Sequence, residues 1–286
     1  MLSIIESGII SREVGRGAFM PVITPLPNGT LVACQNVGTG LGTEDHYIEI
    51  LRSCDGGVVW HNEGGVHGVE GSPNDGWSYR GAAISVVPDG RLVMTATRFK
   101  KTGGSLFNPN TEALQQAEML LLWSEDQGHN WSLPQVVPVE LSPEKYTWNG
   151  AGTLLQLSRD RWMYPLETWK PDGYKGPPDQ KAAVVFSYDQ GRTWEDFTIV
   201  ADDPNGNLLW WDQMCTILPD GRIYTLIWTH KYGTSEDAIN HWVISEDSGK
   251  TWSEPTPTNL HGQVCAPVAL PDGQVVAIYN YRHDPQ

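Results

Sequence analysis

The sequence SYDQGRTW, at residues 187–194, is one of four copies of the pattern Ser-x-Asp-x-Gly-x-x-Trp in this chain. The other copies are SCDGGVVW (53–60), SEDQGHNW (124–131) and SEDSGKTW (245–252), so the pattern recurs every 58 to 71 residues. A pattern that recurs at such a period marks one supersecondary unit that is used several times. The repeat therefore indicates the fold class before any other feature of the 286-residue chain.

A second pattern, Pro-Asn/Asp-Gly, separates pairs of β-rich runs. It occurs at residues 27–29, 88–90, 219–221 and 271–273, with a degenerate form at residues 158–160. Glycine or asparagine supplies the positive φ that a tight hairpin turn needs. Each unit is then two strands joined by this hairpin, a variable loop, a third strand, the Ser-x-Asp turn and a fourth strand. Four-stranded units of roughly 50–60 residues are typical of propeller blades, and we expect no helix beyond a turn or two at residues 111–118.

The Ser-x-Asp-x-Gly-x-x-Trp pattern has a structural purpose. Its aspartate can accept hydrogen bonds from the backbone N–H groups of the turn, and its glycine takes a conformation that is costly for other residues. Its tryptophan can pack back between adjacent blades. We therefore expect the pattern to stabilise each blade and to take no part in chemistry.

The chain resembles the Asp-box (bacterial neuraminidase repeat) proteins of the sialidase superfamily, from about residue 19 to residue 284. The resemblance implies an all-β, sialidase-like β-propeller of four-stranded blades, formed by residues 1–286 as a single domain. That family fold has six blades, and about four and a half are visible here. We therefore expect a domain truncated at its C-terminus. The alternative is a five-bladed ring, closed by an outer strand from residues 3–14.

Composition limits the partners of the protein. A formal net charge of -15 argues against nucleic acid as the main partner. No run approaches the roughly 18 apolar residues of a membrane helix, and no signal peptide is visible. We expect a cytoplasmic protein, or a secreted one if a leader was removed. The four cysteines lack CxxC spacing and read as buried free thiols, so we expect no metal site and no cofactor. An open blade edge would allow pairing into an oligomer.

Counting from the hairpins places candidate catalytic residues on the face opposite the Ser-x-Asp turns. Glu167 and Asp212 are the best carboxylates for general acid or base work, with structural hydrogen bonding as the alternative. Asp45 lies in a Gly-rich loop where the resemblance implies an acid/base aspartate, and a solvated loop carboxylate is the alternative. His230 is a candidate base.

Candidate substrate-binding residues share this face. Guanidinium and imidazole groups suit an acidic sugar, and tryptophans can stack on sugar rings, although ion pairs and packing between blades would also explain them. These candidates are Arg80, Arg98, Arg282, His283, Trp148, Trp169, Trp211 and Gln213.

The chain departs from the sialidase pattern in its first unit. Residues 19–21 read Phe-Met-Pro where the resemblance implies Arg-Ile-Pro, so the first carboxylate-binding arginine is missing. The tyrosine nucleophile belongs to a late blade. We therefore expect a carbohydrate-active, sialidase-like exo-glycosidase that hydrolyses a glycosidic bond of an acidic glycan, and the missing arginine argues against sialidase activity itself. The alternatives are a polysaccharide lyase, with His230 or a tyrosine as base, and a non-catalytic propeller that binds glycan or protein.

Overall fold

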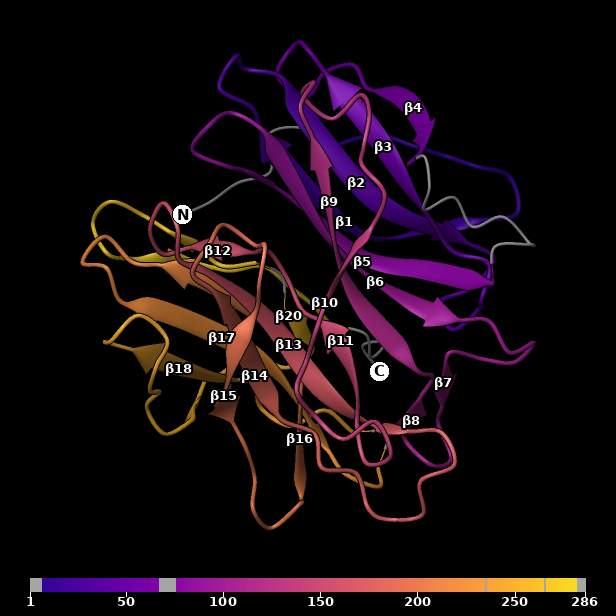
Figure 1. Ribbon diagram of the computed structural model, residues 1–286, viewed down its shortest axis with the longest axis vertical. Helices are drawn as coiled ribbons and strands as arrows, with labels where there is room; N and C mark the ends of the chain where they lie inside the picture. The colour runs from indigo at the N-terminus through magenta and orange to yellow at the C-terminus, as the bar shows by residue number, and fades with distance from the viewer. Residues whose placement is uncertain (1–6, 67–75, 235, 265, 282–286) are drawn as a thin grey trace.

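The computed structural model describes residues 7–66, 76–234, 236–264 and 266–281 of the chain, and every regular element in this part is a β-strand. The strands form four sheets, antiparallel except for one short parallel pair in the third, that follow one another along the chain from the indigo first sheet to the orange fourth (Figure 1). A yellow fifth set of short strands follows the fourth sheet. The fold is the expected all-β propeller.

Each sheet is one blade, with its strands in chain order from the inside outwards. The first blade contains β1 (Gly17–Pro25), β2 (Leu31–Gly38), β3 (Tyr47–Ser53) and β4 (His61–Gly65). The second contains β5 (Trp77–Val86), β6 (Leu92–Lys100), β9 (Ala117–Ser124) and β10 (Gln135–Val137). The fourth contains β16 (Leu208–Ile217), β17 (Ile223–Lys231), β18 (His241–Ser245) and β19 (Thr256–Pro257).

The third blade differs because its inner strand is interrupted and its second strand is extended. Two short strands, β11 (Thr147–Gly150) and β12 (Leu155–Gln156), both pair with β13 (Trp162–Pro171), which is followed by β14 (Ala182–Ser187) and β15 (Glu195–Ala201). The end of β13 also pairs with β8 (Ala113–Leu114), which pairs in turn with β7 (Phe107–Asn108). An excursion of the second blade therefore reaches across to the third.

The last described strands are the inner half of a fifth blade. They are β20 (Gln263–Val264), β21 (Val268–Ala269), β22 (Val275–Val276) and β23 (Tyr279–Asn280). β20 pairs with β23 and β21 with β22, on either side of the turn at residues 271–273. Four complete blades and half of a fifth are thus present in the described residues, as the hairpin count predicts.

The four copies of the repeated pattern, called Asp-boxes from here on, have one geometry. In the third box Ser187 Oγ donates to Asp189 Oδ1 at 2.9 Å and accepts from the Gly191 N–H at 2.7 Å. Asp189 Oδ1 also accepts the Thr193 N–H at 2.8 Å, and the Trp194 indole donates to the Gly191 carbonyl at 3.2 Å. The equivalent bonds recur in the other three boxes. The expected structural role is confirmed.

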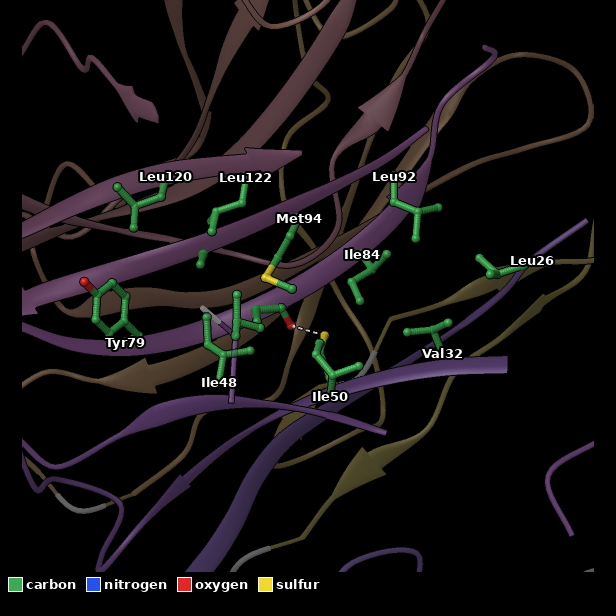
Figure 2. Close-up of a cluster of buried hydrophobic side chains, with 14 residues drawn as sticks. Leu26, Val32, Ile48, Ile50, Tyr79, Ile84, Leu92, Met94, Leu120 and Leu122 are labelled. Carbon is green, nitrogen blue, oxygen red and sulfur yellow. Dashed lines mark hydrogen bonds between the residues drawn. The ribbon is translucent and has the colours of Figure 1, made fainter. Parts of the chain in front are cut away.

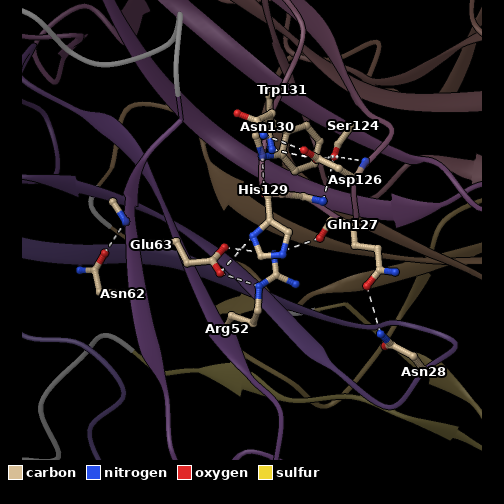
Figure 3. Close-up of polar contacts among 12 residues, drawn as sticks. Asn28, Arg52, Asn62, Glu63, Ser124, Asp126, Gln127, His129, Asn130 and Trp131 are labelled. Atoms are coloured by element: carbon tan, nitrogen blue, oxygen red, sulfur yellow. Dashed lines mark hydrogen bonds and ion pairs between the residues drawn. The ribbon is translucent and has the colours of Figure 1, made fainter.

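An Asp-box can also tie one blade to the next. Figure 3 shows Arg52 of β3 beside the second box, where its guanidinium donates to the Gln127 carbonyl at 3.0 Å. The same guanidinium pairs with Glu63 of β4 at 2.6 Å. Hydrogen bonds from Asn130 and Ser124, opposed by partial burial, lower the pKa of Asp126 to about 2. The box therefore remains ionised and hydrogen-bonded at any physiological pH.

Hydrophobic clusters fill the space between neighbouring blades. Between the first and second blades, Val32, Ile48 and Ile50 face Ile84 and Met94 (Figure 2). Similar clusters pack the second blade against the third and the third against the fourth. Burying each such side chain contributes roughly 1.5–3 kcal/mol. The clusters fix the blades relative to each other and so fix the residues at the centre.

Three local expectations are wrong. Residues 111–118 form no helical turn, because Ala113 and Leu114 are buried and pair as β8. The described residues 7–14 form no strand. They lie against the first blade, where Ser11 Oγ donates to Glu49 at 2.9 Å and Glu13 accepts from the Tyr47 hydroxyl.

Cys34 is a buried free thiol as expected, but Cys54 is exposed. No helix able to cross a membrane occurs in the described residues.

Candidate functional site

A cavity of about 440 Å³ lies where the inner strands of the five sheets meet. Its lining includes residues of β1, β5, β11, β16 and β20. The Asp-boxes lie at the other end of the sheets, because Ser53, Ser124, Ser187 and Ser245 pair with the first residues of β2, β6, β13 and β17. The cavity therefore lies away from the Asp-boxes, as expected for the functional face.

A β-bulge in three inner strands shapes the cavity wall. Register shifts lie between Phe19 and Val22 in β1, between Arg80 and Ala83 in β5, and between Trp211 and Met214 in β16. The first extra residue has positive φ in each case and lines the cavity; the three are Met20 (φ 53°), Gly81 (φ 64°) and Asp212 (φ 44°).

Asp212 occupies the bulge position that glycine fills in the second blade. The left-handed region costs a non-glycine residue on the order of 1–2 kcal/mol, although aspartate tolerates it better than most. A bulge re-aims a side chain, and strained residues of this kind cluster at functional sites. The bulge places Asp212 in the cavity wall, half-buried, where its Oδ2 accepts a hydrogen bond of 2.5 Å from Gln263 of β20.

Glu167 of β13 is the buried partner of Asp212. Its side chain is 1% exposed but lines the same cavity. Oε1 accepts hydrogen bonds from Asn149 at 3.1 Å and from the Trp169 indole at 2.8 Å, and Oε2 accepts the Asp212 N–H at 2.5 Å. Burial and then the negative charge of Asp212 raise the pKa of Glu167 from 4.5 to about 8. Glu167 therefore stays protonated to a higher pH than an exposed glutamate does.

Aromatic side chains form one side of the site. The ring of Trp211 is stacked on that of Trp169 (centroids 5.4 Å apart, 15° between planes) and on that of His230 (4.3 Å, 12°). Phe107 meets Trp169 edge-on at 5.7 Å. The Trp211 ring is therefore already in stacking contact with two neighbouring rings, and a sugar that stacks on it would compete with them.

Among the arginines of the described residues, only Arg80 lines the central cavity. Arg98 lies outside the lining, where its guanidinium pairs with Glu118 at 2.5 Å and covers the Trp77 ring at 4.2 Å. Arg282 and His283, two further predicted substrate ligands, lie outside the described residues.

Four other predicted site residues do not line the central cavity. Asp45 organises its own loop, because its carboxylate accepts bonds from Thr39 and Thr43, and these bonds, opposed by burial, lower its pKa. Trp148 packs into the cluster between the second and third blades. Gln213 is fully buried and donates to the carbonyls of Leu166 and Ala183. His230 borders a neighbouring cavity instead.

Two amides at the starts of inner strands, which the sequence places on this face without assigning them a role, complete the site. Asn149 and Gln263 each hydrogen-bond one of the two carboxylates. Each lies at the start of an inner strand, and this shared position is the signal that could have identified them. Within the described part of the chain, no cluster of three or more His, Cys, Asp or Glu could hold a metal ion.

Comparison with known proteins agrees with this architecture. The model of the BNR repeat-like domain family matches residues 81–286. A Dyadobacter fermentans protein of unknown function superposes with a TM-score of 0.75 at 19% identity, covering 96% of this chain and 78% of its own. An α-L-arabinanase of Penicillium chrysogenum, solved with arabinobiose, gives 0.67 at 15% identity, covering 92% of this chain and 75% of the arabinanase.

A Hadza microbial sialidase has the same fold over a smaller share of its length. Its TM-score is 0.62 at 16% identity, covering 86% of this chain and 47% of the sialidase. At these identities the likeness shows the fold alone. Four Asp-boxes on a propeller of sialidase type, together with the family match over most of the chain, show that the protein belongs to the BNR repeat-like domain family.

Proposed function

We propose that the protein is a glycosidase that hydrolyses a glycosidic bond of an acidic glycan in the central cavity. The observation that carries the proposal is the pair formed by Glu167 and Asp212, two carboxylates in one cavity whose environments differ. Glycoside hydrolysis generally uses two carboxylates, one to protonate the leaving oxygen and one to act as base or nucleophile.

The environments of the two residues assign their roles. Glu167 is buried, and its raised pKa keeps it protonated at neutral pH, as a general acid requires. Asp212 is half-buried and accepts a hydrogen bond from Gln263, so it is the better candidate for base or nucleophile. The distance between the two carboxyl groups in the substrate complex then predicts the stereochemistry at the anomeric carbon: about 5–5.5 Å for retention and about 6.5–9.5 Å for inversion.

The shape and charge of the cavity support the substrate class. Its 440 Å³ volume falls in the range of roughly 300–1,000 Å³ that small-molecule sites occupy. Arg80 provides a guanidinium for an acidic substituent. A cavity at the centre of the propeller, in place of a long groove, favours removal of a terminal sugar. Glycosidases among the similar solved structures make this chemistry a reasonable expectation for the fold.

The test is a glycan panel with matched variants. Wild-type protein, E167Q and D212N would be assayed by product chromatography on acidic and neutral oligosaccharides. E144Q would be the control, because it changes an exposed glutamate outside the cavity. We expect E167Q and D212N to lose at least a hundredfold of turnover while E144Q retains it. Turnover that survives both cavity substitutions would contradict the proposal.

A non-catalytic glycan-binding propeller is the second candidate, and one observation favours it. Glu167 accepts three hydrogen bonds and holds the Asp212 backbone, which is also what a purely structural carboxyl would do. This candidate predicts that a panel glycan binds but is never cleaved. The lyase alternative predicts an unsaturated product with ultraviolet absorbance; the position of His230 outside the central cavity does not support its role as the base.

A further inference from the structure

A second cavity, of about 660 Å³, lies next to the central one. The two cavities share Phe107, Pro109 and Trp211 in their linings. The remaining lining residues come from the excursion of the second blade around β7 and β8, from the end of β13, and from the end of β17 with the loop after it. A ligand that fills the central cavity and extends past this shared wall would enter the second one.

Glu112 is the unusual residue of the second cavity. It lies between β7 and β8, it is one of the residues that line the cavity, and it is 8% exposed. Its Oε1 accepts the N–H of Gly233, 121 positions away in the fourth blade, at 3.1 Å. Its Oε2 is buried and has no hydrogen-bond partner among the residues that the structure describes. The carboxylate therefore bridges two distant loops and keeps one acceptor unused.

The hydrogen bond from Gly233 explains only one of the two carboxylate oxygens of Glu112. A carboxylate oxygen that is buried without a partner is costly, because it gives up its hydrogen bonds to water. The backbone of Glu112 also has φ 54°, in the left-handed region that disfavours a long side chain. Strain combined with an unused acceptor is the kind of outlier from which a binding role is inferred.

The other charges in the cavity narrow the ligand class. Lys170 of β13 also lines it, and no ion pair of its ammonium occurs within the described part of the chain. A carboxylate and an ammonium in the same cavity disfavour a simple cation or a simple anion. They suit a ligand that offers both hydrogen-bond donors and acceptors on neighbouring atoms, which is the pattern of sugar hydroxyls.

We propose that the second cavity binds the next sugar of the glycan, with Glu112 Oε2 accepting a hydrogen bond from one of its hydroxyl groups and Lys170 donating to another oxygen. This inference rests on the proposed function, because it places the second sugar beyond the bond held at Glu167 and Asp212. It makes the substrate a chain of at least two sugars, with the leaving group recognised at Glu112.

The test measures how affinity depends on glycan length. Calorimetry would compare arabinobiose with arabinose, 3′-sialyllactose with N-acetylneuraminic acid, and digalacturonate with galacturonate, on wild type, E112Q and K170M. E112Q keeps an oxygen for the Gly233 N–H but replaces the free carboxylate oxygen with an NH₂ group. E236Q is the matched control, since Glu236 lies on the loop after β17 but outside the cavity lining.

We expect at least one disaccharide to bind wild type more tightly than its monosaccharide. E112Q should weaken that disaccharide roughly tenfold to a hundredfold, the range of one hydrogen bond to a charged group, and leave the monosaccharide unchanged. K170M should also weaken binding of the disaccharide, and E236Q should change neither the disaccharide nor the monosaccharide affinity. The proposal is overturned if no disaccharide gains affinity over its monosaccharide, or if E112Q leaves disaccharide affinity intact or lowers both affinities equally.

The two proposals fail in different ways. If E167Q abolishes turnover but E112Q leaves the dependence of affinity on glycan length unchanged, the proposed glycosidase activity is supported and the proposed second subsite is wrong. If length-dependent affinity requires Glu112 while no glycan is cleaved, the second cavity is a binding subsite of a non-catalytic propeller. Circular dichroism melting of E112Q checks that the bridge to Gly233 survives the substitution.

Discussion

The main-chain N–H of Asp212 donates a 2.5 Å hydrogen bond to Oε2 of Glu167, and so joins the two carboxylates of the central cavity across the third and fourth blades. The bond ties the strained bulge of β16 to the buried carboxyl of β13. It holds Asp212 at φ 44° and keeps its negative charge beside Glu167. One geometric relationship therefore positions the second carboxylate and helps to raise the pKa of the first.

This pair predicts how activity depends on pH. Glu167 must be protonated to act as an acid, and burial followed by the charge of Asp212 raises its pKa to about 8. We expect kcat/KM to be retained at neutral pH and to fall as the pH rises through about 8. A pH profile measured with the best panel substrate checks this, and a fall already complete by pH 6 would exclude Glu167 as the acid.

The same shift predicts how stability depends on pH. The pKa of Glu167 is higher in the folded state than its ordinary value of 4.5, so the folded protein binds a proton that the unfolded chain releases. This contribution is complete below about pH 4.5 and is lost as the pH rises through about 8.

Urea unfolding of wild type and E167Q at several pH values isolates that contribution. We expect the free energy of unfolding of wild type, relative to E167Q, to decrease between pH 5 and pH 8. Titrating groups away from this pair are the same in both proteins and cancel in the comparison, which therefore reports on Glu167 together with Asp212. A difference that stays constant over this range would mean that the pKa of Glu167 is not raised.

Replacing Asp212 with glycine should separate stability from activity. Glycine adopts a positive φ without strain, as Gly81 does in the equivalent bulge of β5. We expect D212G to unfold within about 1 kcal/mol of wild type while turnover falls at least a hundredfold. Chemical denaturation and the panel assay measure the two effects. An active D212G would show that the carboxylate has no role in the reaction.

Arg80 and Arg98 form a matched pair for testing recognition of an acidic substrate. Only Arg80 lines the cavity, whereas Arg98 pairs with Glu118 outside it. We expect R80M to raise KM at least tenfold for acidic glycans, because a charge-assisted hydrogen bond contributes about 1.5–3 kcal/mol, and R98M to leave KM unchanged. Equal effects on acidic and neutral glycans would argue against an acidic group at Arg80.

The Asp-boxes should affect stability without affecting the site. In S187A the buried N–H of Gly191 loses its acceptor, which costs about 1–3 kcal/mol. We expect S187A to have a lower free energy of unfolding and an unchanged KM. S142A, which changes an exposed serine, is the control and should alter neither. A raised KM in S187A would mean that the box influences the cavity at the other end of the blade.

The sequence was sufficient for the fold because its signals are local. An Asp-box closes its own hydrogen bonds within eight residues, and the Pro-Asp-Gly turns fix where each inner strand ends. Counting along strands from these turns was enough to place Glu167, Asp212 and Arg80 in one cavity.

The rest of the site depends on contacts that no local pattern encodes. The sequence does not show that the ring of Trp211 is stacked on both Trp169 and His230. Asp45 could not be separated from the two carboxylates that line the cavity, because the loop that it organises looks the same in sequence as an open active-site loop. Glu112 was missed because its bridge to Gly233 joins positions 121 residues apart.

Leaving-group dependence tests the central claim, that Glu167 protonates the departing sugar, most directly. An acid is needed for a poor leaving group such as a sugar hydroxyl and is almost unnecessary for a dinitrophenolate. The measurement is kcat/KM of wild type and E167Q on a glycan and on the dinitrophenyl glycoside of the same terminal sugar. We predict that E167Q lowers kcat/KM by a factor of roughly 10²–10⁴ on the glycan and by less than about tenfold on the dinitrophenyl glycoside. An equal loss on both substrates, or no loss on either, would contradict the account.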